Sequence, residues 1–533
     1  MASMSSMSVA FSGLKAAQSG LVVTGHNVSN SSVSGYTRQQ GIQQDFSYRN
    51  IGSSPVGSLK MQVGLGTSIA QVRQIRNKFY DASFREENSS GSYYDRKYAA
   101  GQEVNAIIGE LQSQYKAQDV ITDLWNSINE MSKDPSAIDT RYSFIQSSIS
   151  FLDKMQNINK NLFEYQLNLD SQVRREVDAI NNIVARIGEL NQAIQDVEAS
   201  GDRANDLKDL RNNLLDELSG YIDIEIKEVA TGHNNVTRVD ILVQGNELLV
   251  GNVQQKIGLK YVNGDYPFVE PVFSSSDEIL PATDTSKKLF PNLATEDLGT
   301  NSLTTKGSLK GLLVSRGEAI GNYTMDGDQS DNYLIQNVQI KIDKLVNKIV
   351  TLLNDASFGQ GHFGLDGDPG IPIFVRKSGV REGDPENPTD YKTLFTLENI
   401  QINPELLQSD GYNRLGFSKN ANDIGDNTIL KDLIKEWKEP IGDLENSSID
   451  NYYKKIITDF AVKVQEDREK LESKAGTVDL AQNRRLSISG VSLDEELSNM
   501  LRFQHAYNSA AKVVNVLDGM MDKIINGTGR AGL

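Results

Sequence analysis

The chain has 533 residues, a formal net charge of −17 and no cysteine. Its length predicts several domains, because a single hydrophobic core stops growing at about 250 to 300 residues. The lack of cysteine excludes a disulfide framework, a cysteine-ligated zinc site and a thiol nucleophile.

Charge is distributed unevenly along the chain. Residues 1–100 carry ten Lys and Arg against five Asp and Glu, whereas residues 101–533 carry 44 against 66. A nucleic-acid-binding protein concentrates basic residues on one face, and no such concentration is visible, so we expect no nucleic-acid partner. The N-terminus lacks the basic and apolar regions of a secretory signal, and no run of about 18 apolar residues occurs, so we expect no membrane insertion.

An amphipathic helix is predicted at the N-terminus, where an apolar or small residue recurs every three or four positions. This stripe consists of Met7, Ala10, Leu14, Ala17, Leu21, Thr24 and Val28. Asparagine, serine and glycine between Asn27 and Gly35 favour caps and turns, so the helix should end there.

The middle of the chain predicts long helices followed by strands. From about 96 to 218, apolar residues recur at helical spacing, which predicts long antiparallel helices. The clearest run is Val173, Val177, Ile180, Val184, Ile187, Ile194 and Val197. Between Tyr221 and Pro291 the apolar period shortens and glycines at 232, 245, 251 and 264 supply turn points, which predicts a β domain. Helices return near 329–354 and 450–475, while 360–425 is rich in Gly, Pro and Asp and should hold short strands.

A second amphipathic stripe lies near the C-terminus and has the spacing of a heptad seam. It consists of Met500, Phe503, Tyr507, Ala510, Val514, Leu517, Met521 and Ile524. Amphipathic helices gain most of their stability from packing, so each end needs a partner, and we expect both ends to become ordered on assembly. The alternative is that the two terminal helices close an ordinary globular core.

The sequence offers few candidates for catalysis or metal binding. The histidines at 26, 233, 362 and 505 are too far apart for a zinc pair at helical spacing. The acidic segments 326–331 and 366–368 lack the Gly and Glu of an EF-hand calcium loop, so turn chemistry explains them better. No Gly-x-Ser-x-Gly elbow and no glycine-rich phosphate loop occurs, and we expect neither an enzyme nor a cofactor.

Residues 25–40 read GHNVSNSSVSGYTRQQ. This segment resembles the N-terminal signature of the flagellar axial protein family, in which a helix runs into Asn-x-x-Asn and then a Gly-Tyr step. The matching residues are Asn27, Asn30, Gly35 and Tyr36. The Thr-Arg-Gln that follows is most similar to the hook-associated proteins of the hook-filament junction, the FlgK type. Ser34 stands where family members often have proline, which weakens the rigidity of the turn.

Three further blocks resemble the same family in the same order. Residues 204–218 read ANDLKDLRNNLLDEL, with Asn212 where an Asp is usual. Residues 307–318 read GSLKGLLVSRGE, a block with a downstream Arg316 that rod and hook proteins lack. Residues 489–526 are similar to the C-terminal segment shared by axial proteins. The resemblance spans the chain and is weakest at about 221–300 and 360–430.

We therefore expect a multidomain α+β fold with a terminal α-helical coiled coil, a long-helix bundle and outer β-rich domains. The expected coiled-coil domain combines residues 1–60 and 486–533. The expected helical bundle combines residues 61–220, 301–358 and 426–485. Residues 221–300 are expected to form the β-rich outer domain, and 359–425 a Gly/Pro-rich segment with short strands.

The resemblance implies an extracellular structural component of the bacterial flagellum, which joins hook to filament by self-assembly into the axial tube. It implies export by the flagellar type III system. The implied partners are other copies of the chain, the hook protein, a second hook-associated protein on the filament side, and an export chaperone on the C-terminal helix before assembly. The implied assembly interface consists of Leu14, Leu21, Asn27, Val28, Asn30, Gly35, Tyr36 and the eight residues of the C-terminal stripe.

Two alternatives stay open at this point. One is another axial protein, such as hook or distal rod, and residues 307–318 argue against it. The other is an extracellular adhesin or enzyme on an axial scaffold, which would need a dedicated catalytic insert. The candidate inserts, about 221–300 and 360–430, show no catalytic motif.

Overall fold

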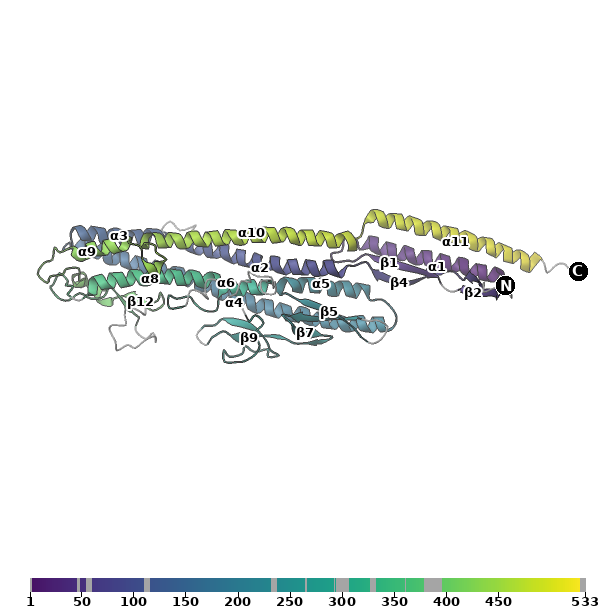
Figure 1. The fold of residues 1–533 in the computed structure, drawn as a ribbon, viewed down its shortest axis with the longest axis horizontal. Coiled ribbons are helices and arrows are strands. Elements are labelled where there is room, and N and C mark those ends of the chain that lie inside the picture. The colour runs from purple at the N-terminus through teal and green to yellow at the C-terminus, as the bar shows by residue number, and fades with distance from the viewer. Residues whose placement is uncertain are drawn as a thin grey trace. The chain divides into compact units, whose positions relative to one another are not determined.

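The chain is seen in a computed structural model (Figure 1). The structure describes residues 2–45, 48–53, 60–109, 116–231, 237–263, 266–291, 293, 306–325, 332–359, 361–377 and 395–527. Its contacts divide the chain into two compact units, each assembled from separate segments. Unit 1 comprises Met1–Asn88, Asn182–Gln254 and Ala475–Leu533, and unit 2 comprises Ser89–Asn181 and Gln255–Lys474.

Unit 1 combines helices with antiparallel strands. Its helical segments come from α1 (Ala2–Ser29), the start of α2 (Lys78–Gly109), the end of α4 (Ile138–Ala199), α5 (Asn205–Tyr221), the end of α10 (Ile449–Ser489) and α11 (Leu493–Gly527). Its strands are β1 (Gln39–Asp45), β2 (Tyr48–Ser53), β3 (Lys60–Gly64), β4 (Thr67–Gln74), β5 (Glu225–Ala230), β6 (Thr237–Val243), β7 (Asn246–Val250) and β8 (Val253–Gln254). Strand β1 pairs with β4 and β2 pairs with β3, while the other four form a sheet in the order β5-β6-β7-β8.

The turn between β6 and β7 follows from its two residues. Gln244 and Gly245 have φ angles of 50° and 76°. Two successive positive φ angles are typical of the two-residue hairpin turn whose twist matches that of the flanking strands. Gly251 also has a positive φ of 65°, so two of the four predicted turn glycines occupy left-handed turns. Positions 232 and 264 lie outside the described residues.

Asn191 of α4 holds this sheet against the helices of unit 1. Its side-chain amide donates to the carbonyl oxygens of Val239 and Gly251, both at 2.8 Å. Its oxygen accepts from Nη1 of Arg211 in α5 at 2.9 Å and from the backbone N–H of Val239 at 3.3 Å. Asn191 is buried, so water cannot reach its amide group. These four bonds replace the hydrogen bonds that the amide makes with water in the unfolded chain.

Unit 2 is mainly helical. It contains the rest of α2, α4 and α10, together with α3 (Ala117–Lys133), α6 (Ser308–Arg316), α8 (Leu334–Phe358) and α9 (Thr428–Lys438). Short 3₁₀ helices cover Pro404–Leu407 (η2), Gly411–Arg414 (η3) and Gly442–Leu444 (η4). Two strand pairs complete it, β9 (Ile257–Tyr261) with β10 (Val269–Phe273) and β11 (Phe374–Arg376) with β12 (Ile400–Ile402).

The helical stripe predicted between Val173 and Val197 lies on the single helix α4. Its first six members are buried, and Val197, near the end of the helix, is 36% exposed. The strands predicted between residues 221 and 291 are also present, with β5 to β8 in unit 1 and β9 and β10 in unit 2. The predicted mixed α+β fold is confirmed, while the predicted domain boundaries stay a prediction.

Helix α6 carries the third resemblance block and is buried along its whole length. Arg316, at its end, is fully buried and pairs with Asp170 of α4. The Arg316 guanidinium also donates to the carbonyl oxygen of Val269 at 2.8 Å, and its central carbon lies 5.1 Å from the ring centre of Phe268. Gly311 lets α6 approach α2, because a Cβ there would lie 2.8 Å from the carbonyl oxygen of Tyr93. Arg316 therefore joins α6, α4 and β10 at the core of unit 2.

The buried carboxyl group of Asp343 in α8 should make the stability of unit 2 depend on pH. Its carboxylate accepts the backbone N–H groups of Tyr323 and Leu397 at 2.9 and 2.8 Å, and burial raises its pKa to about 7. Because this pKa lies above that of an unfolded Asp, the folded state takes up a proton as the pH falls. The stabilisation is fully present below about pH 4 and is lost as the pH rises through about 7. We therefore expect a larger free energy of unfolding at pH 5 than at pH 8.

Tryptophan fluorescence in a urea titration measures this effect, because the chain has two tryptophans and both Trp125 and Trp437 lie in unit 2. In Asp343→Asn the difference between pH 5 and pH 8 should shrink. Burial also raises the pKa of Glu176 and Asp467, so part of the dependence should remain. The exposed Asp410→Asn is the matched control and should leave the difference unchanged. An unaltered pH dependence in Asp343→Asn would contradict the assignment.

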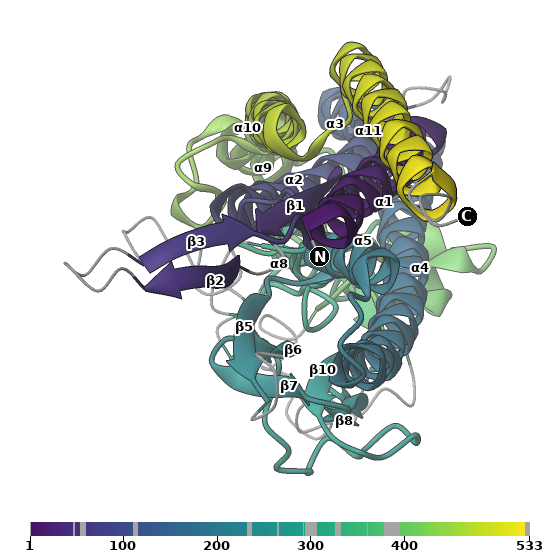
Figure 2. The ribbon, with the colours of Figure 1, turned by 90° about the vertical axis from the view of Figure 1, so that its right-hand side faces the viewer.

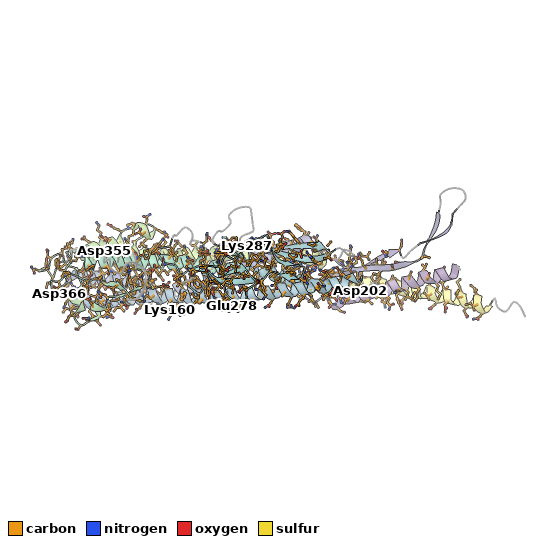
Figure 3. The ribbon with its side chains drawn as sticks, turned by 90° about the horizontal axis from the view of Figure 1, so that it is seen from below. Lys160, Asp202, Glu278, Lys287, Asp355 and Asp366 are labelled. Atoms are coloured by element: carbon orange, nitrogen blue, oxygen red, sulfur yellow. The ribbon has the colours of Figure 1, made fainter. Side chains whose placement is uncertain are left out.

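The acidic segment 366–368 forms a turn. Asp366, which is labelled in Figure 3, accepts the backbone N–H of Asp368 at 3.2 Å. This bond is typical of a turn. The other acidic segment, residues 326–331, lies outside the described residues. In the described part of the chain, no helix is long and apolar enough to cross a membrane.

Candidate functional site

The two terminal stripes pack against each other within unit 1. Helices α1 and α11 lie side by side, as Figures 1 and 2 show. On α11 the stripe residues from Met500 to Met521 are all half-buried, and Ile524 is 54% exposed. On α1, Leu14, Leu21 and Val28 are half-buried, and Ala17 is buried. Each stripe therefore has a partner within the same chain. The sequence analysis combined both ends in one coiled-coil domain, and their ordering on assembly stays a prediction.

The two helices come close together at Gly20. A Cβ on Gly20 would lie 2.6 Å from Cδ1 and Cε1 of Phe503. Gly20 falls between the stripe positions Ala17 and Leu21, so the period alone gave no reason to single it out. The missing side chain makes room for the Phe503 ring between the helices.

Asn27 is the centre of a polar network at the end of α1. Its Nδ2 donates to the carbonyl oxygen of Gln39 at 2.9 Å and to Oε2 of Glu496 at 3.1 Å. Its Oδ1 accepts from Tyr36 Oη at 2.8 Å and from the Gln39 N–H at 3.0 Å. All four hydrogen-bonding positions of this buried amide are filled. Asn27 therefore ties α1 to β1 and to the start of α11.

The neighbouring signature residues shape the turn around this amide. The Asn30 side chain donates to the carbonyl oxygen of His26 at 3.0 Å, and the backbone N–H of Asn30 donates to the same oxygen at 3.1 Å. Tyr36 Oη lies 3.0 Å from His26 Nδ1. Burial, with smaller contributions from Asp206, Asp209 and Glu496, raises the pKa of Tyr36 well above its usual value. The phenol therefore stays neutral and keeps its proton for the bond to Asn27.

Glu496 and Arg38 form the charged part of the network. Glu496 is 2% exposed, and its Oε1 accepts from Arg38 Nε at 2.8 Å. Arg38 Nη1 also pairs with Oε2 of the exposed Glu495 at 2.8 Å. Glu496 lies in the first turn of α11, where a negative charge is favoured by the helix dipole. One buried carboxylate thus holds α11 to α1 and to the chain after the signature turn.

Asp209 connects this network to α5. Its carboxylate accepts the Thr37 N–H at 3.2 Å and Nε2 of Gln74 at 2.8 Å. Burial raises its pKa, and the bond from Thr37 and the nearby Arg76 oppose that rise. Asp209 belongs to residues 204–218, Asn27 and Thr37 to residues 25–40, and Glu496 to residues 489–526. Three blocks far apart in the sequence therefore meet in one place.

Gly35 is required where it stands, because its φ is +76° and a Cβ there would lie 1.9 Å from Asn213 Oδ1. We expect Gly35→Ala to destabilise the turn after α1 by about 1 to 3 kcal/mol. Hydrogen exchange in residues 2–29 should become faster. Gly25→Ala is the matched control, because Gly25 lies inside α1 with open space around its Cα. It should slow exchange slightly, since alanine favours the helix by about 1 kcal/mol. Equal exchange in the two variants would contradict the role of Gly35.

Sequence reasoning named Asn27, Asn30, Gly35 and Tyr36 and missed Arg38, Asp209 and Glu496 as their partners. All three stand in the resemblance blocks, but no sequence pattern pairs an individual residue of one block with a residue of another. Within the described residues, no group of three or more His, Asp or Glu side chains is placed to hold a metal ion. His26 contacts the hydroxyl group of Tyr36, and His362 contacts the carbonyl oxygen of Ala356. His505 is exposed, and position 233 lies outside the described residues.

Comparison with known proteins adds independent findings. A family model described as "Flagellar hook-associated protein FlgK helical domain" matches residues 102–374. A second, described as "Flagellar basal body rod FlgEFG protein C-terminal", matches residues 482–527, which include all of α11.

Individual proteins are similar over almost the whole chain. Flagellar hook-associated protein 1 of Bacillus subtilis is 28% identical over 526 residues, which cover 97% of each chain. Flagellar hook-associated protein 1 of Escherichia coli is 24% identical over 577 residues, covering 97% of this chain and 98% of the relative. The solved structure of the flagellar hook junction protein FlgK from Burkholderia pseudomallei is 16% identical with a TM-score of 0.43, and covers 56% of this chain and 47% of that one. Because the helical-domain model alone spans more than half of the 533 residues, the chain belongs to the flagellar hook-associated protein FlgK family.

Proposed function

We propose that this chain is a structural component of the flagellum that joins hook to filament by assembling with copies of itself into the axial tube. The pairing of α1 with α11, anchored by the network around Asn27, carries this proposal. The pair combines the first and last helices of the chain in one element, and the network fixes that element to α5 through Asp209. Such an element suits repeated contacts between copies, because its long helices leave apolar side chains exposed.

The assembly proposal includes partners and a route of export. The proposed partners beyond other copies are the hook protein on one side and a second hook-associated protein on the filament side. Before assembly, an export chaperone would cover the C-terminal helix α11, and the chain would leave the cell through the flagellar type III system. The exposed leucines and valines of α11 support a need for such cover, because large exposed apolar patches promote aggregation.

Immunogold labelling of isolated hook-filament complexes tests the proposed position. We expect a single band of label at the junction between hook and filament. Cells that lack the chain should build hooks, release filament subunits into the medium and fail to swim. Label along the hook or in the rod would favour another axial role, and attached filaments in the deletion strain would contradict the proposal.

A further inference from the structure

The residues of the α11 seam pack largely against α1 of the same chain. Contacts between copies therefore require other surfaces. Met500, Val514 and Met521 are half-buried on the α11 face that packs against α1. Side chains already packed in this way have little surface left for a neighbouring molecule. Two of the exposed surfaces among the described residues of unit 1 lie beside the seam.

The first surface is a leucine ridge formed by Leu493, Leu497 and Leu501, which are 50%, 50% and 56% exposed. A spacing of four residues places these side chains in a row on one side of α11. Asp494 stands beside the first leucine and is exposed. In the described part of the chain, its carboxylate makes no ion pair. The ridge is thus an apolar row with a negative charge at one end.

The second surface is an arginine groove of about 860 Å³ between α1, α11 and the strands β1 and β4. Six of its thirteen lining residues are glycine or alanine and two are arginine; the others are Gln40, Ile42, Gln43, Thr67 and Phe503. The residues that matter for its shape and charge are Gly13, Ala16, Ala17, Ala506, Arg73 and Arg502. No acidic residue lines the groove, and both arginines are exposed. The groove offers room for branched apolar side chains and attracts a carboxylate.

The ridge and the groove of one chain lie on opposite sides of the seam. At 3.6 residues per turn, Leu497 and Leu501 lie on one side of the seam and Arg502 lies on the other, while Leu493, seven residues before Met500, is almost in line with the seam. A chain therefore cannot fill its own groove with its own ridge. Two different complementary surfaces on one subunit produce head-to-tail contacts, which build rings or helical arrays.

We infer that the leucine ridge of one copy docks in the arginine groove of the next copy, with Asp494 facing Arg502 or Arg73. This inference rests on the proposed function and names the contact through which the copies assemble. Shape and charge both support another copy as the occupant, because the glycines and alanines of the groove leave room for a row of leucines, and the acid of the ridge matches the arginines. The docked contact would cover side chains that are now half-exposed.

Cross-linking of assembled flagella tests the contact, because the chain has no cysteine and introduced thiols are its only ones. Leu497→Cys and Ala506→Cys are placed together in one chain, and isolated flagella from cells with only this variant are treated with a bismaleimide. We expect a ladder of dimers, trimers and larger species on a denaturing gel probed with antibody. Each single variant should give monomer, and flagella from cells that express both single variants should stop at dimers.

Leu493→Cys combined with Leu497→Cys is the matched control, because both thiols then lie on the ridge and no ladder should form. Motile cells with the chain at the junction but no ladder would overturn the docking contact and leave the proposed function standing. A dimer without larger species would overturn the head-to-tail arrangement. If the unmodified chain were absent from the junction, the proposed function itself would fail.

Discussion

Replacing Val514 with aspartate should leave cells that build hooks, release filament subunits into the medium and barely swim. Val514 is half-buried in the middle of the α11 stripe that faces α1. A carboxylate there loses water without gaining a partner, which costs several kcal/mol or opens the contact. The variant should separate α11 from α1 and remove the element on which assembly depends.

Hydrogen exchange in the purified chain checks the physical cause. Peptides from α1 and α11 should exchange faster in Val514→Asp than in the unmodified protein, while unit 2 should be unchanged. The neighbouring Asn515→Asp adds the same charge at an exposed position and should affect neither exchange nor motility. If Val514→Asp swam normally with unchanged exchange, the pairing of α1 with α11 would not be needed for assembly. If the unmodified helices exchanged freely, the pair would form only in the polymer.

Replacing Arg316 with methionine should lower the free energy of unfolding of unit 2 by about 3 kcal/mol. The change removes a fully buried cation and leaves the Asp170 carboxylate without its buried partner, and breaking such a pair typically costs about 3 to 5 kcal/mol. We place the loss at the lower end of that range, because Arg174 also contacts Asp170, at 2.8 Å. The carbonyl oxygen of Val269 also loses a donor.

Denaturant titration followed by tryptophan fluorescence measures this loss, since both tryptophans report on unit 2. Arg174→Met is the matched control, because it removes the partly exposed arginine on the same carboxylate. Exposed ion pairs contribute about 0 to 1 kcal/mol, so the control should change little. Similar losses in the two variants would show that the burial of Arg316 has no special importance.

The sequence determined those features that depend on short stretches of chain. The spacing of three and four placed α1, α4 and α11 and chose the faces that they bury, because a helix repeats every 3.6 residues. Polar residues and glycine predicted the end of α1 between Asn27 and Gly35 and the turn at Gly245, since dihedral preferences and side-chain caps act locally. The four resemblance blocks indicated the family, which the helical-domain match then showed.

Only the tertiary structure decided which distant segments meet. Asn27 and Glu496 form a hydrogen bond across 469 positions, and Thr37 and Asp209 across 172. No local periodicity encodes such a pair, because its partners are chosen by the packing of whole helices. The same reason explains why Gly20 lies under Phe503 and why Arg316 is buried against Asp170. In each case the fold brings two distant groups together in its interior. Water cannot reach them there, so each group needs the other as its hydrogen-bonding or packing partner.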